Sequence, residues 1–285
     1  MKIDGKAIAD KILQNLARQV TALKNKGVTP TLAVILVGDD PASLSYIKQK
    51  QKAADAIGAK VILDQQAASI SSQVLKERIE KYNDDPSIHG IIIQRPLPKE
   101  SPIDRDILNE ISPKKDVDGF IPSSPYDVPV AKAVLTILRE VFALEKKNVK
   151  AQTFEDWLKS QCVAVIGRGE TAGKPIADAL GEHGCTLSVV HSQTAHPEQV
   201  IKTLNIVVSC VGKERVVTKD MIVPGTILIS VGIWRGTDGK LHGDYKEEEI
   251  KDIASYYTPT PGGVGPVNVA CLMQNLVKAC TIQND

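Results

Sequence analysis

The sequence predicts an α/β protein with two domains, each built on a parallel sheet covered by helices. Three observations support this fold class. Helical and strand patterns alternate along both halves of the chain, the strands are apolar on both faces, and a proline-containing and then polar stretch separates the two series. Strands that are apolar on both faces are typical of parallel sheets enclosed by helices. The 285 residues suffice for two hydrophobic cores of ordinary size.

The first series alternates helices with strands. A helix is expected from about Asp4 to Lys26, where Gly27 ends it. The later segments are, in chain order, strand 31–38 (TLAVILVG), helix 45–58 (SYIKQKQKAADAIG), strand 60–65 (KVILDQ), helix 72–82 (SQVLKERIEKY) and strand 90–94 (GIIIQ). Ligands of such sheets bind at the carboxyl ends of strands, which makes Gln94 and residues 38–40 candidates.

The composition changes after Asp118. A proline-rich stretch, 120–130, precedes an apolar helix at 131–142, and the polar residues 145–152 (EKKNVKAQ) form a plausible linker. The second series contains strand–turn–helix 161–184, strands 186–192, 205–212 and 226–233, and a Pro/Gly loop with a final helix at 258–280.

Composition and charge exclude several classes of partner. A formal net charge of +1 creates no general attraction to nucleic acid or to an acidic membrane. The charged start (MKIDGKAIADKI) and the short apolar runs predict neither a signal peptide nor a membrane span, so a cytoplasmic protein is expected. The five cysteines are odd in number and lack CxxC spacing, so we expect reduced core residues and no metal site.

A glycine turn follows the strand that begins the second series. Gly167, Gly169 and Gly173 in VIGRGETAGKP stand between a buried strand and a helix, one residue longer in spacing than the usual dinucleotide fingerprint. Glycines allow the backbone to approach a pyrophosphate, and the start of the helix attracts its charge. The turn indicates a Rossmann-like, nucleotide-binding second domain; an ordinary tight strand-to-helix turn is the alternative.

The next strand favours NADP over NAD. His191 and Ser192 stand where an NAD site usually has a carboxylate for the ribose, and Arg168 projects from the glycine turn. Arg168 could pair with a 2′-phosphate while Ser192 donates a hydrogen bond to it, although a solvated loop arginine is the alternative. Gly232 and Ile233, at the end of strand 226–233, complete the expected cofactor contacts.

One lysine lies on the apolar stripe of helix 45–58. Ile47, Ala54 and Ile57 define that stripe, and Lys50 falls within it, one turn after Tyr46. Its ammonium could extend to water while the stem lies along the core. Alternatively the head remains in a cleft, where desolvation lowers its pKa and suits it to proton transfer.

Six stretches together resemble the bifunctional methylenetetrahydrofolate dehydrogenase/cyclohydrolase family. They occur in the family's order between residues 45 and 275: SYIKQKQKAADAIG, GIIIQRPLP, KKDVDGF, VIGRGETAGKP, VVHSQT and TPTPGGVGPVNVACLMQN. The resemblance implies oxidation of methylenetetrahydrofolate with NADP and hydrolysis of the methenyl product to 10-formyltetrahydrofolate. It also implies a cytoplasmic homodimer that acts in one-carbon metabolism and purine biosynthesis.

The resemblance also implies site residues. Tyr46 would stack on the folate, Lys50 would be the catalytic lysine and Gln94 its hydrogen-bonding companion. Asp118 would bind the polar edge of the pterin, where a carboxylate suits the amino and ring N–H donors. From the residues alone, Asp118 could instead close a turn and Gln94 could pair with a loop.

The Pro/Gly loop would complete the substrate site. Pro261, Gly262 and Gly263 would lie near pterin and nicotinamide, where missing side chains permit close approach; a rigid turn is the alternative. In the family the last helix returns to the first domain. We therefore expect a catalytic domain of residues 1–143 with 264–285, and a nucleotide domain of residues 144–263.

The chain departs from the family pattern on the cofactor side. The loop after Asp118 is short, Gly169 replaces a serine, Asn268 replaces a threonine, and the linker is long. A variant with cyclohydrolase activity only, or with altered cofactor use, is therefore an alternative. Two others are a dehydrogenase of the amino-acid or shikimate type and an inactive folate- or nucleotide-binding protein.

Overall fold

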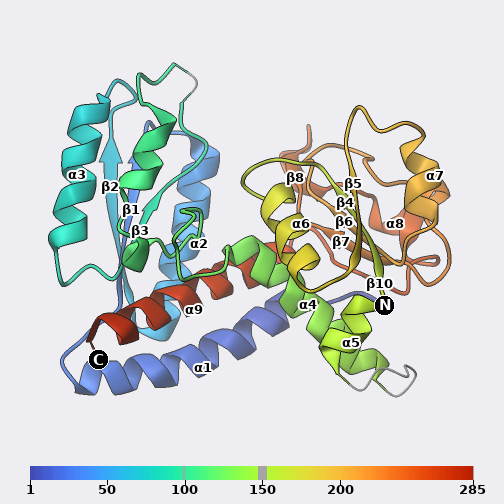
Figure 1. Ribbon diagram of the computed structural model, residues 1–285, viewed down its shortest axis with the longest axis horizontal. Coiled ribbons are helices and arrows are strands. Elements are labelled where there is room, and N and C mark those ends of the chain that lie inside the picture. Colours follow the sequence, from blue (N-terminus) through green and yellow to red (C-terminus); the bar gives the residue numbers. More distant parts are fainter. Residues whose placement is uncertain (99, 147–152, 285) are drawn as a thin grey trace. The chain divides into compact units, whose positions relative to one another are not determined.

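The protein divides into two compact units that surround separate parallel sheets. The computed structural model describes residues 1–98, 100–146 and 153–284. The three-stranded unit comprises Asp10–Pro129 with Val269–Asp285, and the five-stranded unit comprises Met1–Ala9 with Val130–Asn268. Figure 1 shows helices flanking the strands of each unit. The predicted α/β class with two parallel sheets is confirmed.

The sheet of the three-stranded unit has the order β2-β1-β3, and both pairings are parallel. Its fully buried central strand explains the uninterrupted apolar run in the sequence. The elements of this unit, in chain order, are α1 (Gly5–Asn25), β1 (Thr31–Val37), α2 (Pro41–Ile57), β2 (Lys60–Gln66), α3 (Ser72–Asp84), β3 (Gly90–Ile93), the short 3₁₀ helices η1 (Arg105–Glu110) and η2 (Pro113–Lys115), and α9 (Val264–Asn284); the ends of α1 and α9 belong to the other unit.

The two faces of β1 are covered by different helices. One face, which includes Leu32 and Val34, packs in a cluster with residues of α1, α2 and α9. The other face, which includes Ala33 and Ile35, packs with residues of α3 and η1. Alternate side chains of a strand point to opposite faces, so this one run of sequence supplies two cores.

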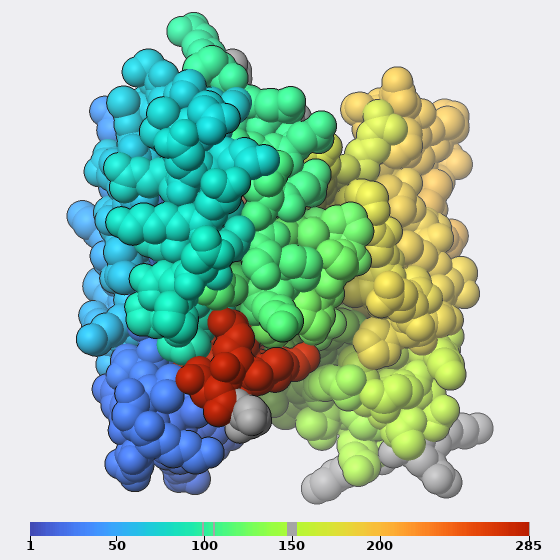
Figure 2. Space-filling view, turned by 60° about the vertical axis from the view of Figure 1, so that its left-hand side comes forward, coloured from blue at the N-terminus to red at the C-terminus, as the bar shows by residue number. Residues whose placement is uncertain are grey.

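Side-chain hydrogen bonds anchor the C-terminal helix α9 in the three-stranded unit. The Asn275 side chain is buried and donates to the carbonyls of Val117 and Asp127, both at 2.9 Å. Near its end, Gln283 donates to the carbonyls of His89 and Lys114. Figure 2 shows the end of this helix, in red, at the surface beside the teal and green segments.

The five-stranded unit has a parallel sheet of order β10-β7-β6-β4-β5, with a separate antiparallel hairpin of β8 and β9. Its order places β4 and β6 centrally, and both are buried along most of their length. The elements are α4 (Pro129–Glu145), α5 (Phe154–Lys159), β4 (Cys162–Ile166), α6 (Gly173–Glu182), β5 (Thr186–Val190), α7 (Pro197–Lys202), β6 (Ile206–Ser209), η3 (Lys219–Met221), β7 (Ile227–Ser230), β8 (Ile233–Arg235), β9 (Leu241–Gly243), α8 (Glu247–Ile250) and β10 (Tyr256–Tyr257).

The packing units differ from the predicted domain boundaries at the start of the chain, at residues 130–143 and at residues 264–268. The first residues join the five-stranded unit because Lys2 bridges to Tyr257 and the Ile3 amide donates to the Tyr257 carbonyl. Helix α4 joins it too, and its Phe142 packs on Trp157 of α5. The division into folate-binding and nucleotide-binding domains stays a prediction. Residues 147–152 of the expected linker lie outside the described residues.

Among the described residues, no helix has the length and apolar character needed to cross a bilayer. Within the same three stretches of chain, no group of three or more His, Cys, Asp or Glu side chains is arranged to hold a metal ion.

Because His89 is buried, we expect the folded protein to lose stability in mild acid. The Nδ1 of His89 accepts a hydrogen bond from the Thr31 amide, and burial together with the nearby Lys115 charge lowers the pKa of the ring, against an opposing effect of Asp85. The unfolded chain therefore binds a proton more readily than the folded chain. We expect the free energy of unfolding to fall as the pH decreases below about 6.5, the ordinary histidine pKa.

The measurement is urea unfolding of the wild type and of His89→Asn between pH 7.5 and pH 5. The stability difference between them should shrink toward acid pH, because the variant has lost the group that titrates. His196→Asn, at an exposed histidine, is the control and should follow the wild type. A difference that is independent of pH would contradict the assignment.

Candidate active site

The lysine-bearing helix α2 starts at the carboxyl end of β1. Asp40 caps it by accepting a hydrogen bond from the Ser43 amide at 2.8 Å, and Pro41 occupies the first turn. Gly58 ends the helix with a φ of 77°, a left-handed conformation that glycine adopts without strain. These local signals fix where the helix begins and ends, and so where Lys50 lies relative to the strand ends.

The lysine meets a glutamine from another strand. The Lys50 Nζ donates to Gln94 Oε1 at 3.0 Å, and Gln94 follows β3 directly at the carboxyl edge of the sheet. Gln94 is only 9% exposed, and its Nε2 donates to the Arg95 carbonyl at 2.8 Å. This second bond turns the amide oxygen toward the lysine, so the pair is oriented from both ends.

The surroundings of this pair favour a neutral amine. Desolvation lowers the pKa of Lys50, while the charge of Asp118 acts in the opposite direction. The residue as a whole is partly buried, but its head group is enclosed by protein. Burial also raises the pKa of Tyr46, which lies one turn earlier on α2 and is 38% exposed. Of the two alternatives for this lysine, the hydrogen bond and the desolvation argue against an ammonium group that extends to water.

Asp118 is held in a tight loop after η2. Its neighbour Asp116 is buried, accepts from the Ile121 amide at 2.9 Å, and receives the Gly119 amide on its carbonyl. Asn275 of α9 holds the Val117 carbonyl on the other side. Burial raises the pKa of Asp116, and the charge of Asp118 adds to that effect.

The loops after β3 and after Asp118 also touch through a cation–π contact. The Arg95 guanidinium lies 3.7 Å from the centre of the Phe120 ring. All four predicted catalytic residues thus lie in the three-stranded unit. The structure directly joins Lys50 to Gln94, places the Asp118 charge within electrostatic reach of Lys50, and locates Tyr46 on the same helix.

In the five-stranded unit, the glycine turn runs from β4 into α6. Gly167 has a φ of 102°, and a Cβ on Gly173 would lie 2.2 Å from the Gly167 carbonyl oxygen, so neither position accepts another residue without strain. A Cβ on Gly169 would instead meet open space. No side chain caps the start of α6. Such a turn fits a pyrophosphate, which would meet backbone N–H groups and the helix dipole.

The other expected cofactor residues lie after β5 and β7. The His191 amide donates to Thr194 Oγ1, and His191 Nδ1 accepts from the Gln193 amide, which shapes a tight loop that leaves Ser192 exposed. Ile233 begins β8, and a Cβ on Gly232 before it would lie 2.3 Å from the Gly212 nitrogen. Arg168 is exposed beside the turn.

The Pro/Gly loop precedes α9. Gly262 has a φ of 101°, and a Cβ on Gly263 would lie 2.4 Å from the Pro259 carbonyl oxygen. The backbone is therefore closely packed at the predicted Pro261–Gly263 position, as both a rigid turn and a substrate loop require.

The structure buries three polar side chains that the sequence patterns did not single out, namely Asp116, Asn275 and Asp244, which follows β9. Asp116 stood inside a recognised motif, and Asn275 was a polar position in an apolar helix, so each left a weak signal. Asp244 left none, because an aspartate after a short hairpin is ordinary in sequence.

The protein has two parallel sheets. One carries a dinucleotide-type glycine turn, and the other carries an enclosed lysine–glutamine pair, which is the arrangement of a two-domain nucleotide-dependent α/β enzyme. Comparison with protein families identifies the family of enzymes. Residues 3–118 match the tetrahydrofolate dehydrogenase/cyclohydrolase catalytic domain, and residues 148–284 match the NAD(P)-binding domain of the same family. The chain belongs to the tetrahydrofolate dehydrogenase/cyclohydrolase family, which confirms the resemblance found in the sequence.

Individual relatives agree over nearly the full length. The Bifunctional protein FolD of Bacillus licheniformis is 42% identical over 286 residues, covering 99% of this chain and 98% of the relative. The protein of the same name from Acidovorax ebreus is 40% identical over 277 residues and covers 97% of each chain.

Solved structures show the same fold. The Campylobacter jejuni FolD methylenetetrahydrofolate dehydrogenase/cyclohydrolase superposes with a TM-score of 0.90 at 34% identity, covering 99% of both chains. The Trypanosoma brucei FolD structure, in complex with NADP cofactor and an inhibitor, gives a TM-score of 0.87 at 30% identity and covers 99% of this chain and 97% of that one.

Proposed function

We propose that this chain is an NADP-dependent methylenetetrahydrofolate dehydrogenase that also hydrolyses methenyltetrahydrofolate to 10-formyltetrahydrofolate. The observation that carries the proposal is the desolvated Lys50 amine, bonded to Gln94 and opposed in charge by Asp118. Membership of the tetrahydrofolate dehydrogenase/cyclohydrolase family supports both activities.

The folate is assigned to the three-stranded unit. Tyr46 offers a partly exposed ring on which the folate can stack, and the Asp118 carboxylate suits the amino and N–H groups of a pterin. Gln94 keeps the lysine head in one direction. For residues 261–263, which belong to the five-stranded unit, a substrate contact stays a prediction that their glycine backbone permits.

The cofactor is assigned to the five-stranded unit. Gly167, Gly169 and Gly173 would hold the pyrophosphate at the start of α6, and the open space beside Gly169 suits this role. Arg168 and Ser192 would bind the 2′-phosphate, and Gly232 and Ile233 would lie near the nicotinamide. His191 shapes the loop that presents Ser192. When bound, NADP accepts a hydride from the methylene carbon of the folate.

The hydrolytic step depends on the lysine. Water adds to the electrophilic methenyl carbon and loses one proton, which a neutral Lys50 amine can accept. The lysine returns this proton to the departing ring nitrogen as one carbon–nitrogen bond breaks. The remaining hydroxyl proton passes to solvent as the formyl carbonyl forms, so the step releases one proton overall. The lowered pKa of Lys50 increases the neutral fraction near neutral pH, and Gln94 Oε1 holds the amine in position.

The assignment of Arg168 predicts a change in cofactor preference. In Arg168→Ala, the ratio of kcat/KM for NADP to that for NAD should fall by about tenfold or more, because a charge-assisted contact to the 2′-phosphate is lost. Steady-state kinetics with each cofactor measure the ratio. Lys202→Ala, at an exposed lysine of α7, is the control and should leave it unchanged. An unaltered ratio in Arg168→Ala would show that the 2′-phosphate is bound elsewhere.

A spectrophotometric assay tests the function as a whole. Methylenetetrahydrofolate is supplied with NADP or with NAD, and methenyltetrahydrofolate is supplied alone. We expect reduction of NADP in the first assay and cofactor-independent loss of methenyltetrahydrofolate in the second. Hydrolysis without cofactor reduction would identify a cyclohydrolase-only variant. Folate binding with neither reaction would identify an inactive binding protein.

We also propose a cytoplasmic homodimer that acts in one-carbon folate metabolism and supports purine biosynthesis. The metabolic role follows from the proposed reaction, because its product, 10-formyltetrahydrofolate, carries a formyl group that purine biosynthesis can use. Among the described residues, β5 forms an end of the five-stranded sheet and exposes Val189, which supports self-association along that edge.

A further inference from the structure

Asp244 is a fully buried carboxylate that the proposed mechanism does not use. It follows β9 in the five-stranded unit and has 0% exposure. A buried carboxylate is costly unless hydrogen bonds replace its water, so its partners indicate why it is there.

Four donors converge on this carboxylate. Oδ2 accepts from Ser209 Oγ at 2.6 Å and from the Val211 amide at 3.0 Å. Oδ1 accepts from the Gly212 amide at 2.7 Å and from the Lys213 amide at 3.0 Å. Three successive backbone N–H groups form an anion-binding nest, which here is filled by a side chain of the protein itself.

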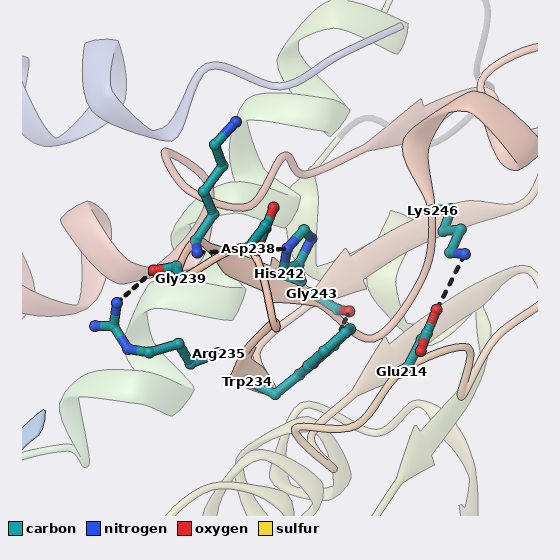
Figure 3. Close-up of polar contacts among 9 residues, drawn as sticks. Glu214, Trp234, Arg235, Asp238, Gly239, His242, Gly243 and Lys246 are labelled. Carbon is teal, nitrogen blue, oxygen red and sulfur yellow. Dashed lines mark hydrogen bonds and ion pairs between the residues drawn. The ribbon is translucent and has the colours of Figure 1, made fainter.

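The hairpin that carries Asp244 is itself secured. Trp234 Nε1 donates to the Gly243 carbonyl at 3.0 Å, and the indole stacks on the His242 ring with centroids 4.9 Å apart (Figure 3). The Asp244 amide donates to Ser230 Oγ at the end of β7. The carboxylate is therefore held by contacts within the hairpin and with β7, in addition to its contacts with the loop that it binds.

The loop held by Asp244 adjoins the glycine turn. A Cβ on Gly167 would lie 3.2 Å from the Cys210 carbonyl oxygen and 3.5 Å from a Val211 methyl group. On the other side, a Cβ on Gly232 would lie 2.3 Å from Asp244 Oδ2. The carboxylate thus lies directly against Gly232, and the loop that it binds packs against the glycine turn at Gly167.

We infer that Asp244 is a positioning residue of the nucleotide site, which holds residues 211–213 and Gly232 in the arrangement that NADP requires. The inference rests on the proposed function for the identity of the cofactor. It assigns Asp244 no contact with the cofactor. Its effect should therefore appear in cofactor affinity and not in hydrolysis at the three-stranded unit.

The test replaces Asp244 with asparagine in the full chain. The asparagine NH₂ group would face backbone N–H donors and could not accept hydrogen bonds from them. Residues 211–213 would then be held less firmly. We expect the Kd for NADP, measured by calorimetry, and the KM for NADP each to rise by about tenfold or more. The kcat of the dehydrogenase should change less, and hydrolysis of added methenyltetrahydrofolate should stay within about twofold, since cofactor is not needed there.

Two further variants keep the test decisive. Asp252→Asn makes the same chemical change at an exposed site of the same unit, and it should behave as the wild type. Ser209→Ala removes one of the four donors and should raise the Kd for NADP about two- to fivefold, even if Asp244→Asn fails to fold.

The outcomes separate the inference from the proposed function. An unchanged Kd for NADP in folded Asp244→Asn would overturn the inference. If that variant is unfolded, an unchanged Kd in Ser209→Ala would do the same. A parallel loss of dehydrogenase and hydrolase activity in folded Asp244→Asn would also overturn it. If the wild type binds NADP but catalyses neither reaction, the proposed function fails while a raised Kd in the variants still supports the inference. A wild type that does not bind NADP overturns both.

Discussion

Lys50→Met is expected to lower the rate of methenyltetrahydrofolate hydrolysis by at least about 100-fold, because positioned acid–base groups contribute at least that much. Folate affinity should remain close to that of the wild type, since the side chain keeps a similar length and apolar stem. Stopped-flow or steady-state absorbance measures hydrolysis, and equilibrium titration measures folate binding. Full hydrolase activity in the variant would refute the role of this lysine.

Two companion variants separate charge from proton transfer. Lys50→Arg keeps a positive charge but does not release its proton, so it should not restore hydrolysis. Lys48→Met makes the same change at an exposed position of the same helix and should be silent. In the wild type, the hydrolysis rate should increase with pH through the lowered pKa of Lys50.

Asp118→Asn is expected to weaken folate binding by about tenfold or more, because a charge-assisted contact to the pterin becomes a neutral one. A second effect follows from the electrostatics of the site. The Asp118 charge raises the pKa of Lys50, so its removal should lower that pKa further. The pH profile of residual hydrolysis should therefore shift toward lower pH.

Saturation kinetics over a range of pH measure both effects in the same experiment. Asp127→Asn, at an exposed residue of the same connecting segment, is the control and should alter neither. Unchanged folate affinity in Asp118→Asn would place the pterin elsewhere. A changed affinity with an unshifted pH profile would mean that Asp118 does not influence the lysine.

Local sequence predicted the position of Lys50 on its helix but not the surroundings of its ammonium group. The spacing of Ile47, Ala54 and Ile57 placed Lys50 on the apolar stripe of a helix, and the observed helix agrees. The spacing could not distinguish a lysine that extends to water from one enclosed in a cleft. That difference depends on Gln94, which is 44 residues away in the chain and arrives through the parallel sheet.

Domain membership shows the same limit at the ends of the chain. The first helix and the last helix were predicted at nearly their observed positions, because capping and periodicity are local properties. The attachment of residues 1–3 to β10 was missed, since backbone pairing between distant segments leaves no trace in side-chain pattern.

The sequence by itself determined the alternation of helices and strands, the glycine turn and the residues that resemble a folate-dependent family, since each depends on neighbours along the chain. The resemblance suggested Gln94 as the companion of Lys50, and the tertiary structure showed their hydrogen bond. Only the tertiary structure decided that Asn275 reaches Val117 across 158 residues and that Asp244 fills a nest of backbone donors. The physical reason is that these groups are satisfied by partners brought together by packing of the whole unit, and burial then makes those partnerships obligatory.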